Sequence, residues 1–430
     1  MKQLMENITL RVCSLLLVVA SSAMAEETVI HCGHLLDVEK RKIVDDTRIL
    51  VRDGVITEIG DSVNASADAD QVDLSSSYCS PGLMDLHTHF FVDSTGEPLD
   101  YVTRKHSSAF NALDGVRDAR TLVNMGFTTI RIPGDFDRHY ANIEIRDAIS
   151  RGEFVGPRML VAPHTISPLG GHGDYNSYAP DGAEILGPMV VDGVENLRSA
   201  VRREIKYGAD WIKVMASGGV MSQHDDPTVA AYSAEEFKAL ADETHRHKKK
   251  ITAHAHGDAG IRAAVEAGFD SIEHATMLSD ETIRLMVKKG TYYVPTLYVL
   301  DWILEMGSKG GITANNLAKA KKVTETHADS VRRAYKAGVK MALGSDQIFP
   351  MEQSILEFQA MAKRIPDNWY VLQMGTINAA DMLGLKDSIG SLKVGKQADI
   401  VAMLANPIED IRAVEQIHFV MKGGELIRTE

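Results

Sequence analysis

The stretch Gly82-Leu83-Met84-Asp85-Leu86-His87-Thr88-His89-Phe90 is an apolar segment of strand length that ends with two histidines. In a strand, side chains at positions i and i+2 face the same way, so His87 and His89 are expected to point to one side together. Two imidazoles on one side can share a metal ion. Further apolar segments of strand length follow along the chain, at residues 128–132, 158–163, 211–216, 251–256, 271–274, 292–297 and 340–344.

Helical patterns separate these segments. The clearest begins at Ser233, where Glu236 follows at the spacing of a capping box and Phe237 and Leu240 share one face. Strands that alternate with helices indicate parallel β/α units. Eight such units predict an α/β fold, a closed (β/α)8 TIM barrel. The competing architecture is a doubly wound open sheet, but no G-x-G-x-x-G turn follows an early strand to favour it.

Both ends of the chain are rich in strand patterns. Residues 47–51 and 55–60 flank Asp53-Gly54, which is the signal of a β-hairpin. Near the other end, residues 398–403 and 419–427 have similar patterns. We therefore predict a small composite β-sandwich domain formed by residues 26–80 and 385–430, beside a barrel domain at 81–384.

The first 25 residues have the pattern of a secretory signal peptide. Lys2 and Arg11 precede an apolar run at 12–20, and the segment ends with Ala23-Met24-Ala25. We expect cleavage after Ala25 and a periplasmic or secreted protein. The apolar run is shorter than the ~20 residues that a transmembrane helix requires, so stable membrane insertion is not expected.

The net charge limits the classes of binding partner, and the cysteine content limits the possible disulfides. The formal net charge of −13 disfavours nucleic acid and anionic membrane surfaces, because both require a basic face. Cleavage after Ala25 would remove Cys13 and leave Cys32 and Cys79. An oxidising compartment permits a disulfide between these two residues, and a pair of free buried thiols is the alternative.

Four more polar residues stand at the ends of predicted strands: Lys213, His254, His274 and Asp346. Each has an ordinary explanation by itself, since a lone histidine in an apolar strand is usually a core residue. Together with His87 they recur at successive strand ends, and barrel enzymes place their sites at that C-terminal mouth. Histidines with a carboxylate suit zinc and related ions, whereas an unmodified lysine would be costly to bury there.

The chain resembles the amidohydrolase superfamily in these motifs and in two longer stretches. These are S-P-G-L-M-D-L-H-T-H at 80–89 and I-G-S-L-K-V-G-K-Q-A-D-I-V at 389–401, together with L-G-S-D at 343–346. The resemblance covers essentially the whole chain after residue 25. It is closest to the imidazolonepropionase-related branch that contains Xaa-Pro and Xaa-Arg dipeptidases and ochratoxin-type amidases. Imidazolonepropionase itself is less similar, because it works with one metal and lacks the bridging lysine.

The resemblance implies a centre of two divalent metal ions, with zinc as the expected metal. His87, His89 and Asp346 would hold the more buried ion, and His254 and His274 the more exposed one. Lys213, carboxylated on Nζ by CO₂, would bridge the two ions. Desolvation in an apolar strand favours the neutral amine that carboxylation requires.

The metal centre, the loops after the strands and, for Tyr232, the resemblance suggest roles around the substrate. Asp346 would act as general base and then general acid, and Tyr232 would donate to the oxyanion; packing at the start of the Ser233 helix is the alternative for Tyr232. Substrate contacts are expected from His172, His164, His224 and Gly219. Residues 92–105, including Arg104, have the length of a lid. Strand alternation places Glu273 opposite His274, which predicts a structural role for it.

These observations predict an exported amidohydrolase that cleaves an amide bond beside a free carboxylate. The substrate would be a small peptide-like molecule, so that the enzyme is a dipeptidase or an N-acyl-amino-acid amidase, and relatives suggest a homo-oligomer. A cyclic amide or lactone hydrolase with the same metal centre is a second hypothesis. A non-catalytic binding protein on the same fold is a third, since fold alone does not establish activity.

Overall fold

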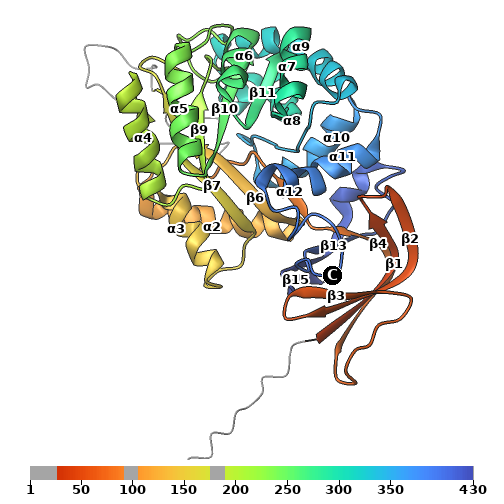
Figure 1. The fold of residues 1–430 in the computed structure, drawn as a ribbon. Helices are drawn as coiled ribbons and strands as arrows, with labels where there is room; N and C mark the ends of the chain where they lie inside the picture. Colours follow the sequence, from red (N-terminus) through yellow and green to blue (C-terminus); the bar gives the residue numbers. More distant parts are fainter. Residues whose placement is uncertain (1–26, 92–104, 175–188, 430) are drawn as a thin grey trace, which may run out of the picture.

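The computed structural model describes residues 27–91, 105–174 and 189–429 of the chain, as a barrel and a smaller β domain (Figure 1). The predicted signal peptide and most of the predicted lid, including Arg104, lie outside these residues. Among the described residues, no helix has both the length and the apolar character that crossing a bilayer requires.

The barrel is built of parallel strands whose helices lie on its outside (Figure 1). In chain order and in sheet order the strands are β5 Leu83–Asp85, β6 Phe127–Asp135, β7 Arg158–Ser167, β9 Trp211–Met215, β10 Lys250–Gly257, β11 Ser271–Met277 and β12 Tyr292–Val294. The two-residue strand β8, Met189–Val190, pairs with β7.

Residues 340–346 fill the eighth position and close the barrel. On one side Tyr293 N donates to Lys340 O at 2.9 Å, and on the other Leu86 N donates to Leu343 O at 2.9 Å. Asp346 N donates to His87 O at 2.7 Å, so this segment also fixes the end of the first strand. The predicted fold class is thereby confirmed.

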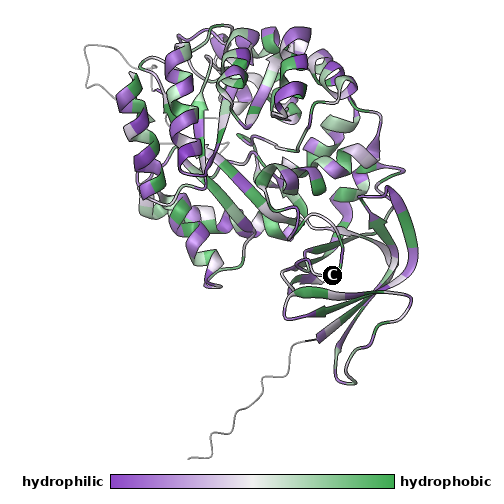
Figure 2. Ribbon diagram, viewed as in Figure 1, coloured by the Kyte–Doolittle hydropathy of each residue, from purple (hydrophilic) through white to green (hydrophobic). Residues whose placement is uncertain are grey.

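The helices of the barrel turn apolar faces inward and polar faces to solvent (Figure 2). Helix α5 begins with the capping box predicted at Ser233 and Glu236. The helices, in chain order, are α2 Ser108–Asn124, α3 Ala141–Ser150, α4 Val194–Lys206, α5 Ala234–Arg246, α6 Asp258–Ala267, α7 Asp280–Lys289, α8 Leu297–Met306, α9 Ala314–Ala337, α10 Glu357–Ala362, α11 Asn368–Met374 and α12 Ile377–Leu383. Short 3-10 helices lie at Gly307–Gly310, Met351–Leu356 and Ile411–Gln416.

The two ends of the chain meet in one mixed sheet with the order β15-β14-β13-β4-β1-β2-β3 (Figure 1). Its strands are β1 Glu27–Asp37, β2 Lys42–Arg52, β3 Val55–Gly60, β4 Asp70–Pro81, β13 Ile400–Met403, β14 Ile417–Lys422 and β15 Glu425–Thr429. The sheet curls so that Ile56 N donates to Lys396 O at 2.8 Å, which brings β3 back beside the segment before β13. The two layers of the composite domain are therefore parts of a single sheet. The domain limits at 80/81 and 384/385 stay a prediction.

A disulfide joins Cys32 on β1 to Cys79 on β4. Both residues are fully buried in the apolar core of this sheet, beside Ile30 and Ile400. Of the two states that the sequence left open, the structure has the disulfide. Such a bond is consistent with an oxidising compartment and so with export.

Candidate metal centre

His87, His89 and Asp346 meet at the C-terminal mouth of the barrel. Asp346 Oδ1 lies 3.3 Å from His87 Nε2 and 3.1 Å from His89 Nε2. One donor atom from each residue fits within 4.8 Å of the others, which is close enough to hold one ion. The remaining ring nitrogens have partners: His89 Nδ1 lies 2.9 Å from Gly134 O, and His87 Nδ1 lies 2.7 Å from Glu273 Oε2. The predicted H-x-H pair therefore points its free nitrogens at one carboxylate.

The charge state of this group suits a divalent cation. Burial alone would raise the pKa of the Asp346 carboxyl, but His87 and His89 hold that pKa well below its usual value. Burial lowers the pKa of the His89 imidazole. An ionised carboxylate beside a neutral imidazole offers lone pairs and a compensating negative charge, which is the donor set of a metal site.

A second group of imidazoles adjoins the first. The rings of His254 and His274 lie 4.4 Å apart between centroids, and burial lowers both pKa values well below the usual histidine value. His274 Nδ1 contacts Thr296 Oγ1 at 2.7 Å and lies 3.7 Å from Asp346 Oδ2. His254 Nε2 is buried without a hydrogen-bond partner. A buried lone pair with no donor is costly unless something binds to it, so this nitrogen supports a second ligand set.

Lys213 lines the same cavity from β9. Its side chain is almost fully buried, and desolvation lowers the pKa of its amine to about 8. An amine with this pKa is partly neutral at physiological pH, as a lysine that reacts with CO₂ must be.

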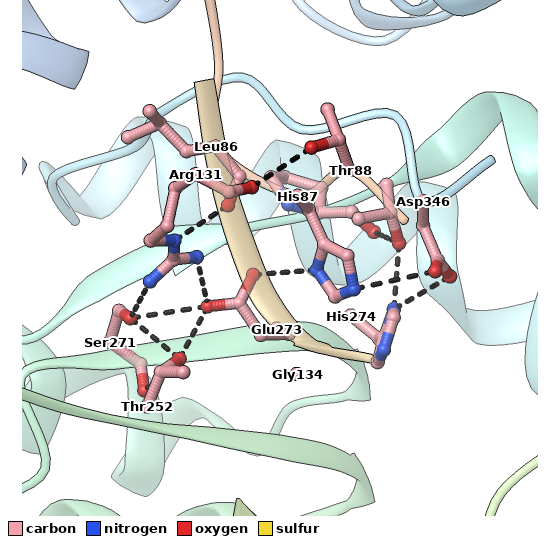
Figure 3. A network of polar contacts seen from close by, with 12 residues as sticks. Leu86, His87, Thr88, Arg131, Gly134, Thr252, Ser271, Glu273, His274 and Asp346 are labelled. Carbon is pink, nitrogen blue, oxygen red and sulfur yellow. Dashed lines mark hydrogen bonds and ion pairs between the residues drawn. The ribbon is translucent and has the colours of Figure 1, made fainter. Parts of the chain in front are cut away.

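Three residues of this site have left-handed backbone angles. His274, Thr296 and Asp346 have φ values of 69°, 53° and 53°. Residues other than glycine adopt such angles at a cost, and residues with this kind of strain cluster at functional sites. At His274 this angle also breaks the alternation of β11, with the result that Glu273 and His274 both turn toward the barrel interior. The predicted placement of Glu273 on the side opposite His274 is therefore wrong, because its carboxylate contacts His87 directly (Figure 3).

His172 is the predicted substrate residue that the structure brings into the cavity. Its ring lies tilted against that of His254 with 4.3 Å between centroids, and its Nδ1 lies 2.8 Å from Ser222 Oγ. Gly219 packs against the same ring, since a side chain at Gly219 would overlap His172. Gly219 thus acts on the cavity through His172.

The structure places three other predicted residues away from the lining of this cavity. His164 points toward helix α4, where its Nδ1 pairs with Glu204 at 3.1 Å, and the next residue, Thr165, lines the cavity instead. His224 is exposed on the loop after β9. Tyr232 donates its hydroxyl to Val191 O at 3.0 Å and packs in the core, which is the alternative given for it above.

His256 joins the site although the sequence analysis did not single it out. It lines the cavity, stacks 5.1 Å from His274, and contacts Thr276 Oγ1 through Nδ1 at 3.2 Å. The signal for it was the spacing His254-Ala255-His256, which repeats the i, i+2 pattern of the first strand.

The wall of the cavity opposite the imidazoles is apolar. Helix α8 contributes Val299, Leu300 and Ile303, and the loop after β9 contributes Val220 and Met221. These side chains belong to one buried cluster that is separate from the main barrel core. A cavity with a polar, ligand-rich side and an apolar side is suited to a small molecule that has both characters.

The barrel and its histidine–aspartate site define a metal-dependent hydrolase. The amidohydrolase family model matches residues 78–427, and the chain belongs to this family. It is therefore a metal-dependent amidohydrolase that acts on carbon–nitrogen bonds.

Individual relatives cover nearly the whole chain. Ochratoxinase of Aspergillus niger is 33% identical, over 96% of this chain and 89% of that protein, and its crystal structure matches with a TM-score of 0.83 at 94% and 96% coverage. A Xaa-Pro dipeptidase with bound methionine in its active site is 33% identical, with a TM-score of 0.88 over 94% of this chain and all of that one. A prolidase complexed with N-methylphosphonate-L-proline is 29% identical, with a TM-score of 0.86 at the same coverage.

Proposed function

We propose that this protein is an exported dipeptidase or N-acyl-amino-acid amidase with two divalent metal ions, expected to be zinc. The observation that carries the proposal is the convergence of neutral imidazoles, one carboxylate and one buried lysine on a single cavity with an apolar wall. The relatives point the same way, since their names refer to Xaa-Pro dipeptides, a bound amino acid and ochratoxin hydrolysis. Assembly into homo-oligomers stays a prediction.

The residues present fit two ions. His87, His89 and Asp346 form the first donor set. His254 and His274 form the second donor set, and the unpartnered His254 Nε2 is a nitrogen that would coordinate a cation. Lys213 would bridge the two sets once its neutral amine attacks CO₂, which forms an N–C bond and releases one proton. The resulting carbamate replaces a buried cation with an anionic oxygen donor.

When bound, the two cations would polarise the substrate carbonyl and lower the pKa of water. The chain supplies the proton transfers. Asp346 is ionised and can accept the proton of the attacking water, then deliver it to the leaving amine nitrogen. His172, whose pKa is lowered by burial, lines the cavity and would contact the substrate.

The test is metal content followed by a substrate panel. Gently purified protein should contain about two metals per chain, and the zinc-loaded enzyme should hydrolyse dipeptides or N-acyl amino acids that have a free carboxylate. The same compounds with that carboxylate amidated should react at least ten-fold more slowly. A metal-loaded protein that cleaves only cyclic amides or lactones would contradict the proposal, and a protein that binds no metal would support a non-catalytic role.

The apolar wall of α8 should select an apolar side chain of the substrate. We expect Leu300→Ala to lower kcat/KM about ten-fold for a substrate with a large apolar side chain, and much less for its glycine analogue, since lost pocket contacts of this size correspond to ~10–200-fold. Steady-state kinetics give the ratio of kcat/KM for the apolar substrate to kcat/KM for its glycine analogue. Ile283→Ala on α7 is the control, because Ile283 is equally buried but does not line the cavity, and it should leave the ratio unchanged.

A further inference from the structure

A fully buried polar layer lies inside the barrel directly beneath the metal centre (Figure 3). Its members come from three strands and have no solvent exposure: Arg131 on β6, Thr252 on β10, and Ser271 and Glu273 on β11. Burying a carboxylate and a guanidinium is expensive unless each hydrogen-bonding group has a partner. The Glu273–Arg131 pair therefore calls for a reason beyond filling the barrel with apolar side chains.

The two oxygens of Glu273 have different partners. Oε1 accepts from Arg131 Nη2 at 2.6 Å and from the Thr252 hydroxyl, whose oxygen in turn accepts from Ser271 Oγ at 2.7 Å. Oε2 faces His87 Nδ1 at 2.7 Å. Because Arg131 and Thr252 donate to Oε1, Oε2 is the oxygen that accepts from the ring of His87.

This contact determines which nitrogen of His87 carries the proton. An ionised carboxylate only accepts hydrogen bonds, so His87 Nδ1 must be the protonated nitrogen. Its Nε2 then presents a lone pair on the side of Asp346, which lies 3.3 Å away. The opposite tautomer would set a lone pair against Oε2 and turn an N–H toward the metal position.

Arg131 holds the backbone on both sides of the same histidine. Its Nε donates to Leu86 O at 2.6 Å, while its own carbonyl accepts from Thr88 N at 3.1 Å. Its guanidinium also lies over the Trp211 ring, 4.8 Å from the centroid. The arginine thus holds the backbone around His87, which follows strand β5, and the glutamate holds the ring.

We infer that Glu273, held by Arg131, is a positioning residue of the metal centre: it locks His87 in the Nδ1-protonated tautomer with Nε2 free for the ion. The inference rests on the proposed metal function, because it concerns how strongly the ion is bound. Carboxylates that orient a metal-binding histidine typically account for 10–100-fold in affinity.

The experiment is a Co²⁺ titration of metal-stripped protein, followed by the visible spectrum of the bound ion. Glu273→Gln keeps the shape of the side chain but adds an N–H donor, which competes with the protonated Nδ1 of His87. We expect the affinity for one of the two Co²⁺ equivalents to fall about 10–100-fold, and the cobalt absorption bands to change. Wild-type affinity and an unchanged spectrum in a folded Glu273→Gln variant would overturn the inference.

Glu204→Gln is the matched control. Glu204 is an equally buried carboxylate, and it pairs with the buried Nδ1 of His164 at 3.1 Å, away from the lining of the cavity. Its loss should lower the stability of the fold and leave Co²⁺ affinity and spectrum as in the wild type. A similar loss of metal affinity in both variants would show that destabilisation alone is responsible, and the inference would fail.

A second variant covers the case in which Glu273→Gln does not fold. Glu273→Asp retains the negative charge opposite Arg131 but shortens the reach to His87, and it should also weaken binding of one Co²⁺ equivalent. Normal binding in that variant would overturn the inference. Failure of the proposed function is a separate outcome, recognised when the wild-type protein itself binds no metal.

Discussion

Asp346→Asn is expected to lower kcat by about 10²–10⁴-fold while the fold is retained, since a positioned general base contributes a factor of that size. The asparagine side chain has nearly the same shape and can still contact His87 and His89, but its amide cannot take up the proton of the attacking water. Single-turnover rates at saturating zinc would isolate the chemical step from metal binding. The metal content of the variant is measured in parallel.

Asp118→Asn is the control for this prediction. Asp118 is a largely buried carboxylate on α2 that does not line the cavity, so this change should leave kcat close to that of the wild type. A fully metal-loaded Asp346→Asn enzyme with near-normal turnover would remove Asp346 from proton transfer. The proton would then have to pass through another group at the mouth of the barrel.

Periodicity predicts the fold because it is a local property. The alternation of apolar strands with helical patterns places β5 to β12 nearly where the structure has them. The ends of the strands differ where backbone angles change: the last predicted strand before α8 stops at Val294, since Thr296 adopts a left-handed angle and Leu297 begins the helix. The closing eighth segment is recognisable from its apolar run, but its few backbone contacts depend on neighbours distant in the sequence.

The site is predictable where polar residues recur at or just after the ends of the barrel strands. In the structure the predicted strand ends at Asp85, before His87 and His89, yet both histidines are joined to Asp346 as expected. Strand alternation fails at Glu273, because a positive φ at His274 turns two consecutive side chains to the same side. No local pattern in the sequence predicts that angle, although a glutamate within a predicted barrel strand is itself a signal.

Other misplacements arise from tertiary contacts. His164 follows strand alternation, but which face of β7 borders the cavity depends on the neighbouring strands, and Glu204 on α4 attracts its ring to the outside. The Tyr232 hydroxyl donates to the carbonyl of Val191, which lies 41 positions away in the sequence, and no local sequence pattern predicts this contact. The metal-ligand candidates at the strand ends are thus predicted better than the substrate contacts, whose positions depend on neighbouring elements.

Lys213→Ala is expected to lose most of the bound metal and with it at least 10²-fold in activity, and a short-chain carboxylate should restore both. The truncated side chain leaves space in which acetate or propionate can place an oxygen donor between the two histidine groups. Lys213→Arg is the matched variant. It keeps the positive charge and fills the space, so neither CO₂ nor added carboxylate can repair it. The rescue is measured as the metal content of each variant with and without propionate at roughly 0.1 M. A buried metal pair requires a compensating anionic group, which propionate can supply in Lys213→Ala.

The same lysine should make reconstitution depend on pH in a defined direction. Carboxylation requires the neutral amine, and burial lowers the pKa of Lys213 to about 8, so about one amine in ten is neutral at pH 7 and most are neutral above pH 9. At constant dissolved CO₂, zinc uptake by metal-stripped protein should therefore accelerate as pH rises through 8 and then level off. Uptake that is independent of CO₂ across this range would refute the carbamate. Rescue of Lys213→Arg by propionate would refute it too, because the arginine leaves no room for a substitute bridge.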